Sequence, residues 1–421
     1  MQFILALLKT RTLRDTFISF IGLGATAFIG FIYTVILARH LGPSVYGVYS
    51  AVTALSAIIF GLGDLGITSS LINFLPKLPE KRQSIINTSF IFQLSICFLS
   101  LILFFVFAIF HQLIIPGSTF GYLILAGVIT VNYLIIGYIQ GIFVARKNFW
   151  SYSLSQILDS GIKIVLVFIL LYFSRLDIGT AISANIVSTL IAIIITFGAD
   201  LLKIKPVFER ATFSLLFAFA KWIAVSKVFS VLISRIDIIL LNLMVSSYSA
   251  GIYSAASRIT LLFALLLGSL NAVVNPRFSG FDTPQKALIY IKKLFLFVCG
   301  IALLMLITIV LAGPIINLVF GNSYIEAIPV FQYLTLAMIP FLFSLITTPA
   351  IIYTFNRPDF YAKVTALQVA LLITIELLLI PRVGYYAPVI ATGITNLLVM
   401  VISTIKLKQL LGIVKPSATG G

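Results

Sequence analysis

The chain has 421 residues, of which 61% are hydrophobic and 10% are charged, and its formal net charge is +16. An ordinary soluble chain is about half apolar and about a quarter charged, so this one has too little polar surface to cover a water-soluble globule. The composition excludes a soluble enzyme, a disordered chain and a secreted disulfide scaffold, and it predicts a polytopic membrane protein.

Long apolar runs recur from one end of the chain to the other, and a helix that crosses a bilayer needs about 20 such residues. Transmembrane strands would instead alternate over about 10 residues. We therefore predict an all-α protein with twelve transmembrane helices, over residues 15–38, 44–75, 83–110, 118–144, 152–173, 178–199, 212–243, 248–276, 288–312, 325–353, 359–380 and 385–405. The connections are short and rich in turn residues, so no soluble domain is expected.

The basic residues predict the orientation of these spans. With the N-terminus in the cytoplasm, 20 of the 28 Lys and Arg residues fall on the cytoplasmic side, 3 on the outer side and 5 within spans. This bias is the positive-inside rule, and it explains the net charge without a nucleic acid partner. We expect a multi-pass protein of the cytoplasmic (inner) membrane with both termini in the cytoplasm.

The chain also contains an internal repeat. Residues 45–55, VYGVYSAVTAL, align with residues 249–259, SAGIYSAASRI, at the starts of the second and eighth spans. Because each half then holds six spans, both halves have the same orientation and are related by an axis along the membrane normal. The repeat predicts two pseudo-symmetric six-helix lobes, residues 1–205 and 206–421, around a central cavity, as in an alternating-access transporter.

Four cations lie within the seventh and eighth spans, where an ionisable residue costs at least about 2.5–3.5 kcal/mol at mid-bilayer. They are Lys221, Lys227, Arg235 and Arg258, and their counterparts 204 residues earlier are Phe17, Leu23, Phe31 and Ala54. A purely structural need would be expected in both lobes. We therefore predict a cationic cavity wall for an anionic ligand, especially phosphate or pyrophosphate. The alternative is a set of scattered ion pairs or cations near the membrane interfaces.

Three carboxylates in spans are candidates for ion or proton coupling. Asp64 lies in the glycine-rich stretch FGLGDLGITS, where unwound backbone and a carboxylate suit a cation or a proton; the alternative is a kink solvated by polar neighbours. Asp159 precedes Lys163 by four residues, which favours a self-neutralising pair on one helix face. Asp237 is expected to pair with Arg235 or with a neighbouring helix.

Several functional motifs are absent from the sequence. The chain has no CxxC, HExxH or His/Cys cluster, so no metal site is predicted, and no cofactor is expected apart from Na⁺ or H⁺ as a coupling ion. It has no GxxxxGK[ST], so ATP use has no support. It has no DxD motif and no long outer loop, so we do not expect an enzyme.

Three segments resemble one family of membrane transporters. They are TLRDTFISFIGLGATAFIGFIYTVILARHLGPSVYGVYSAVTAL over residues 12–55, GLGDLGITSSLINFLP over 61–76 and SYSAGIYSAASRI over 247–259. In these segments the chain resembles the polysaccharide-biosynthesis flippases (Wzx-like proteins) of the multidrug/oligosaccharidyl-lipid/polysaccharide exporter superfamily. The resemblance implies two six-helix lobes around a cavity that opens to one side at a time. It also implies that Lys227, Arg235 and Arg258 meet the pyrophosphate or acidic sugars of the substrate.

The function implied by this resemblance is transport of undecaprenyl-pyrophosphate-linked oligosaccharide across the cytoplasmic membrane, for surface polysaccharide such as O-antigen. The expected partners are this lipid-linked oligosaccharide, membrane lipid and a polysaccharide polymerase. Two other functions stay open. An ion-coupled multidrug antiporter of the same superfamily would need acids to hold cations, and a membrane glycosyltransferase or ligase would need catalytic residues in a large outer loop.

Overall fold

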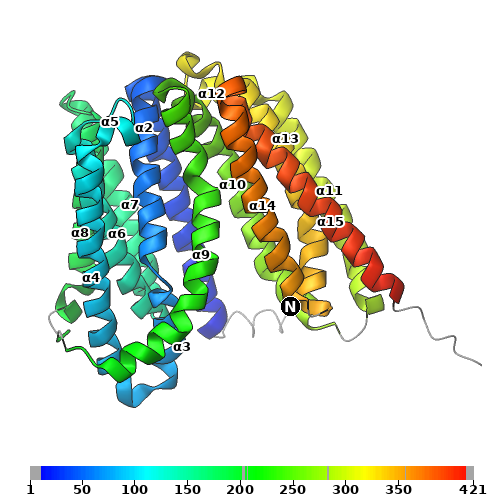
Figure 1. Ribbon diagram of the computed structural model, residues 1–421, viewed down its shortest axis with the longest axis horizontal. Coiled ribbons are helices and arrows are strands. Elements are labelled where there is room, and N and C mark those ends of the chain that lie inside the picture. Colours follow the sequence, from blue (N-terminus) through cyan, green and yellow to red (C-terminus); the bar gives the residue numbers. More distant parts are fainter. Residues whose placement is uncertain (1–10, 202–203, 206, 282–283, 356, 414–421) are drawn as a thin grey trace, which may run out of the picture. The chain divides into compact units, whose positions relative to one another are not determined.

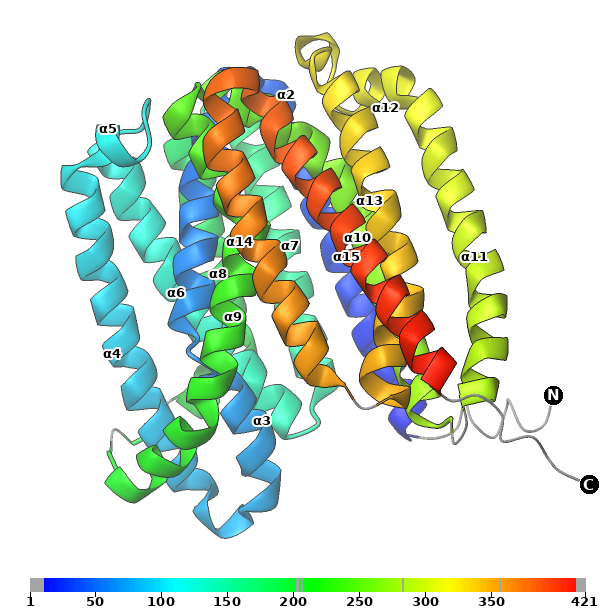
Figure 2. The ribbon, with the colours of Figure 1, turned by 45° about the vertical axis from the view of Figure 1, so that its right-hand side comes forward.

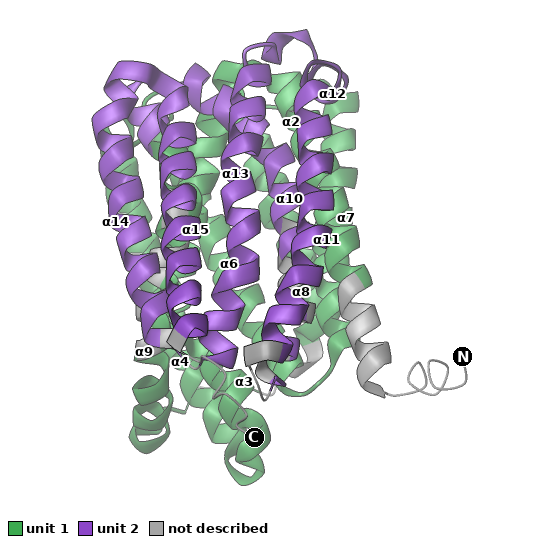
Figure 3. Cartoon of the chain, turned by 90° about the vertical axis from the view of Figure 1, so that its right-hand side faces the viewer, with its two compact units in different colours: residues 1–239 green, residues 240–421 purple. Residues whose placement is uncertain are grey.

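The computed structural model describes residues 11–201, 204–205, 207–281, 284–355 and 357–413. Every regular element in these ranges is a helix, and the chain forms two compact units, residues 1–239 and 240–421 (Figure 3). The all-α prediction is confirmed. The predicted position of both termini lies outside the described residues, and the predicted lobe boundary between residues 205 and 206 stays a prediction.

Eight stretches of the described residues are long and apolar enough to cross a membrane. Two of them, Ile21–Lys77 and Asp359–Gly412, have 57 and 54 residues, which is more than twice the length of about 20 that one crossing needs. The long helices α9 and α10 are not among the eight. The structure therefore confirms a multi-pass membrane protein, while the exact number of twelve spans stays a prediction.

Unit 1 begins with a helix, α2, that contains a sharp break. Its helices are α2 (Arg11–Gly63), α3 (Ile67–Lys77), α4 (Arg82–Ile109), α5 (His111–Ile114), α6 (Phe120–Ala145), α7 (Phe149–Tyr172), α8 (Ile178–Leu201) and α9 (Arg210–Met244), the last as far as Ile239 (Figure 1). Gly42 has a φ of 71°, which a glycine adopts without strain, and Pro43 follows it. The break falls in the turn that the sequence predicts between the first two spans.

The core of unit 1 is formed mainly by α3, α4 and α6. Leu71, Ile85 and Ile142 are completely buried in it, and Tyr138 is almost so. The buried hydroxyl of Tyr138 donates to the carbonyl oxygen of Ile86 at 2.8 Å, so it carries no unpaired polar atom into the core. This packing fixes the position of α3 within unit 1, although a non-helical turn separates α3 from α2.

The chain between α8 and α9 is held against α4 by polar contacts. The backbone N–H of Glu209 donates to Thr88 Oγ1 at 3.2 Å, and the hydroxyls of Ser84 and Thr212 donate to the Glu209 carboxylate. These two donors lower the pKa of Glu209 below its ordinary value, because they stabilise the charged form. The first turn of α9 is therefore positioned on unit 1 before the helix enters the membrane.

Unit 2 is built around α13, which lies between α11 and α15 (Figure 2). Its helices are α10 (Ser247–Ser279), α11 (Pro284–Val310), α12 (Ala312–Val319), α13 (Ala327–Pro349), α14 (Pro358–Val383) and α15 (Ala387–Ile413). A short π-helical turn, Ala350–Thr354, continues α13. Phe278, Val298, Met305 and Leu342 are completely buried in its core.

Glycine at position 66 is required by both conformation and space. Its φ is +77°, and a Cβ there would lie 2.6 Å from the carbonyl oxygen of Ala220 on α9. Gly66→Ala should therefore lower the free energy of unfolding by about 1–3 kcal/mol. Gly24→Ala in α2 is the matched control, because a Cβ there meets nothing within 4 Å. Thermal unfolding of the purified protein in detergent measures both, and equal melting temperatures for the two variants would contradict this assignment.

Candidate functional site

The second predicted span, residues 44–75, is interrupted by a non-helical turn within unit 1. α2 ends at Gly63 and α3 begins at Ile67, and the intervening Leu65 and Gly66 have φ values of 41° and 77°. A left-handed leucine is uncommon and is strained by about 1–3 kcal/mol. Such strain persists only where the surrounding structure enforces it, and here it lifts Asp64 out of the regular helix. The glycine-rich stretch is thus an unwound turn, as the sequence indicates.

Asp64 at this turn has two partners. Its Oδ1 accepts hydrogen bonds from the hydroxyl and the backbone N–H of Thr68, the latter at 3.4 Å, and its Oδ2 forms an ion pair with Lys227 Nζ on α9. The Asp64 side chain is 13% exposed and that of Lys227 is 37% exposed. The two residues that the sequence assigns to different roles, ion coupling and substrate binding, therefore neutralise each other. Lys227 is the more accessible partner.

The ion pair lines a cavity of about 420 Å³ within unit 1. Residues of α2, α3, α6, α7 and α9 surround it, and its polar lining includes Thr68, Gln140 and Tyr152 beside the ion pair. Gly141 on α6 lets α3 approach closely, since a Cβ there would lie 2.8 Å from Thr68 Cγ2. A membrane-embedded space that combines apolar walls with a few convergent polar groups is typical of a ligand site.

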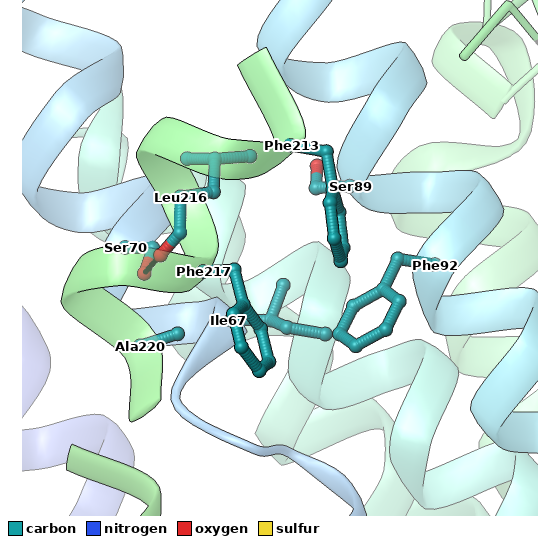
Figure 4. A pocket seen from close by; sticks show the side chains of 8 residues that line it. All are labelled: Ile67, Ser70, Ser89, Phe92, Phe213, Leu216, Phe217 and Ala220. Carbon is teal, nitrogen blue, oxygen red and sulfur yellow. Dashed lines mark hydrogen bonds between the residues drawn. The ribbon is translucent and has the colours of Figure 1, made fainter. Parts of the chain in front are cut away.

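Aromatic packing between α3, α4 and α9 holds α9 in place. The rings of Phe92, Phe213 and Phe217 lie around Ile67 of α3 (Figure 4), and the Phe92 and Phe213 centroids are 5.1 Å apart. The hydroxyl of Ser70 donates to the carbonyl oxygen of Leu216 at 3.2 Å. These contacts join α3 and α9 less than four turns before Lys227, so they set the position of its side chain along α9.

The other predicted cations do not line this cavity. Lys221 is exposed, and Arg235 is half-buried about 12 Å farther along α9 than Lys227. Arg258 is half-buried on α10 in unit 2. The predicted meeting of all four cations in one cavity therefore stays a prediction. Asp237 is half-buried, and its Oδ1 accepts from the backbone N–H of Ile238 at 2.8 Å.

A second polar cluster joins α7 and α8 within unit 1. Lys163 Nζ lies 3.2 Å from Asp159 Oδ2, so the predicted pair on one helix face is confirmed. The hydroxyls of Ser188 and Thr189 donate to Asp159 Oδ1 at 2.9 and 2.7 Å. Both oxygens of this carboxylate are therefore engaged, one by Lys163 and the other by two hydroxyls of α8.

Tyrosines of α2 extend this cluster. The hydroxyls of Tyr33 and Tyr49, which lie on either side of the break at Gly42, are 3.0 Å apart, and Asn185 Nδ2 donates to Tyr33 Oη at 2.6 Å. Lys163 Nζ lies 5.7 Å from the centre of the Tyr33 ring. These residues were not predicted from the sequence, because they carry no charge. The signal that could have indicated this cluster is the spacing of Asn185, Ser188 and Thr189, which places three polar groups on one face of an apolar helix.

No group of three or more His, Cys, Asp or Glu side chains that would hold a metal ion occurs in the described part of the chain. What the cavity offers is one ammonium group, one carboxylate and a few hydroxyl and amide groups. An ammonium group in a low-dielectric site attracts an anion such as phosphate, and a carboxylate released from its partner attracts a proton or a cation.

Removing one partner of the Asp64–Lys227 pair should destabilise the fold more, per substitution, than removing both partners together. Lys227→Met leaves the less exposed Asp64 uncompensated, so it should lower the melting temperature more than Asp64→Asn does. The double variant should recover part of the loss, with a coupling free energy of about 0.5–3 kcal/mol. A double-mutant cycle of thermal unfolding in detergent measures this coupling, and strictly additive losses would show that the pair is not formed.

Lys163→Met should lower the free energy of unfolding by up to about 3 kcal/mol, because it leaves a largely buried carboxylate with hydroxyl donors but without its cation. Combining it with Asp159→Asn should restore much of that stability, since the amide needs no counterion. The measurement is the denaturation midpoint of each purified variant. If the double variant is no more stable than Lys163→Met, the pair does not account for the loss.

Comparison with known proteins places the chain in a family. Residues 12–281, more than half of the chain, match the family described as "Polysaccharide biosynthesis protein". A Shigella flexneri protein named "Putative O-antigen transporter" is 26% identical over 334 residues, which are 73% of this chain and 76% of that protein.

Solved structures of transporters share the fold. An inward-facing multidrug resistance MATE family transporter of the MOP superfamily superposes with a TM-score of 0.72 and 16% identity, over 95% of this chain and 100% of its own. The lipid II flippase MurJ in an inward closed conformation has a TM-score of 0.71 and 16% identity, over 93% of this chain and 87% of its own. The chain has the fold of these transporters, and it belongs to the polysaccharide biosynthesis protein family.

Proposed function

We propose that this protein is a flippase that moves undecaprenyl-pyrophosphate-linked oligosaccharide across the cytoplasmic membrane by alternating access. The observation that carries the proposal is the accessible ammonium of Lys227 in a membrane-embedded cavity, held by Asp64 at a helix break. The family and the Shigella flexneri relative support a role in surface polysaccharide export, and the lipid II flippase shows that this fold serves a lipid-linked saccharide.

In this mechanism the pyrophosphate competes with Asp64 for Lys227. A phosphate oxygen forms a charge-assisted hydrogen bond as strong as that of a carboxylate, and pyrophosphate carries more negative charge. Lys227 is the more exposed member of the pair, so it can change partners while its backbone stays in place. The polyprenyl chain remains in lipid while the headgroup occupies the cavity, and rocking of the two lobes then exposes it on the outer side.

The displaced carboxylate supplies a means of ion coupling. Asp64 without Lys227 would be a poorly solvated negative charge in the membrane, which favours uptake of a proton or Na⁺. Thr68 would still hold it in position through two hydrogen bonds. Asp159 is less suited to this role, because Lys163, Ser188 and Thr189 already engage both of its oxygens. We therefore assign the coupling of substrate and ion to Asp64.

A multidrug antiporter is the second candidate, because the MATE family transporter has the same fold. An antiporter of cationic drugs requires a carboxylate available to the drug. Among the described lining residues the one carboxylate, that of Asp64, is paired with Lys227, which would repel a cation. The chemistry of the cavity thus favours an anionic ligand over a cationic one.

The proposal is tested by reconstituting the purified protein in liposomes with an undecaprenyl-pyrophosphate-linked oligosaccharide and following the exposure of the sugar to an external lectin. Lys227→Glu should reduce the rate at least about tenfold, because it replaces the ammonium with a second negative charge. Lys227→Arg should retain most activity. Lys363→Glu, an exposed charge reversal in unit 2, is the control for net charge and should transport normally.

Two results together would instead support the antiporter. The wild-type protein would move no lipid-linked oligosaccharide under a H⁺ or a Na⁺ gradient, and it would move cationic dyes. Normal lipid transport by Lys227→Glu would contradict the assignment of the cavity. The polysaccharide polymerase stays an expected partner, and co-purification from membranes is the measurement that addresses it.

A further inference from the structure

Unit 2 contains a second, separate cavity that the proposed mechanism does not use. It has a volume of about 310 Å³ and lies among α11, α13 and α15. Phe295 and Phe343 form an aromatic pair in its wall, with ring centroids 5.6 Å apart, and Ile346 and Leu411 extend the apolar lining. α13 lies between the other two helices in Figures 2 and 3. The lining residues come from all three helices, and we call this cavity the groove.

The groove presents an apolar surface even where threonines line it. Thr347 and Thr404 line it, but their hydroxyls donate to carbonyl oxygens of their own helices, at 3.2 Å to Ser344 and 2.7 Å to Met400. Their only hydroxyl hydrogens are thereby used within the helix, and the methyl groups remain for contact. A polar ligand would find no free hydroxyl donor at these two positions. The lining instead favours a hydrocarbon chain.

One end of the groove carries a positive charge. Lys408 is exposed and lines the groove near the C-terminal end of α15, and no described carboxylate forms an ion pair with it. From Met400 to Leu411 the lining extends about 16 Å along α15. The predicted orientation places Lys408 toward the cytoplasmic face, where a lipid phosphate would meet it. A hydrocarbon slot with one ammonium at the interfacial end matches a lipid with a phosphate headgroup.

We infer that this groove binds the carrier lipid itself, with one polyprenyl chain along Phe295, Phe343 and Ile346 and its phosphate on Lys408. The choice of this lipid rests on the proposed function. It also follows from the shape and charge of the groove, because a polyprenyl phosphate has one chain and one phosphate group. A diacyl phospholipid would place only one of its two chains there. The site would hold the carrier at the face from which the substrate loads.

The experiment uses full-length protein in phosphatidylcholine nanodiscs, with undecaprenyl phosphate as the probe and bound lipid counted by native mass spectrometry. Lys408→Glu should weaken binding at least about tenfold, because it places a carboxylate at the phosphate position. Lys406→Glu is the matched control, since it changes the same charge two residues away on another face of α15 and does not line the groove. It should leave the affinity nearly unchanged, because it does not alter the lining.

A second pair of variants tests the hydrocarbon slot without changing charge. Thr404→Phe fills the groove and should reduce binding to a similar extent, whereas Ile405→Phe, at a neighbouring position 52% exposed and outside the lining, should not. Thermal unfolding of the lipid-free variants confirms that each is folded. Equal binding by Thr404→Phe and Ile405→Phe would overturn the inference.

Competition identifies the lipid. Undecaprenyl phosphate should stay bound in the presence of excess phosphatidylglycerol. If phosphatidylglycerol displaces it already at equal concentration, the groove is a general site for anionic lipid and the inference is overturned. The result is independent of the cavity in unit 1. Undecaprenyl phosphate binding that needs Lys408, in a protein that moves no lipid-linked oligosaccharide, would refute the proposed transport alone. Transport without any binding in the groove would refute this inference alone.

Discussion

The ion pair between Asp64 and Lys227 is the interaction on which the account of this protein depends. Placing even one ionised group at mid-bilayer costs several kilocalories per mole, so two such groups persist only when each compensates the other or when a ligand does. Here the carboxylate is largely buried and the ammonium is more than a third exposed, which makes the pair stable without a ligand and open to exchange. In the mechanism that we propose, a phosphate group takes the place of the carboxylate at Lys227.

The surrounding structure positions this pair by steps that begin in the sequence. Glycines on both sides of Asp64 allow the chain to leave the helix, and the left-handed Gly66 brings α3 against the backbone of α9 at Ala220. Ser70 and the phenylalanines around Ile67 then fix the register between α3 and α9. The polar cluster at Asp159 joins α2, α7 and α8 on its own. In the proposed mechanism the Asp64–Lys227 pair exchanges partners, while the cluster at Asp159 holds three helices of the same unit together.

Much of the fold was predictable from composition and periodicity, because a bilayer admits few backbone structures and long apolar runs define its helices. The break at Gly42 was expected from LGPS, and the unwound turn at Asp64 is one of the two alternatives that its flanking glycines suggested. The partner of Asp64 did not follow, because Lys227 is 163 residues away and no local pattern encodes a contact between α9 and α3. The hydroxyls that hold Asp159 were missed for the same reason, since they belong to a neighbouring helix.

The exchange of partners at Lys227 is tested most directly by measuring the affinity of undecaprenyl pyrophosphate for the wild-type protein and for Asp64→Asn in neutral nanodiscs. If the pyrophosphate displaces Asp64, removing the carboxylate eliminates the competitor, and the variant should bind about tenfold more tightly, a gain of about 1.4 kcal/mol. Unchanged or weaker binding by Asp64→Asn would contradict the account, because Asp64 would then not compete with the ligand for Lys227.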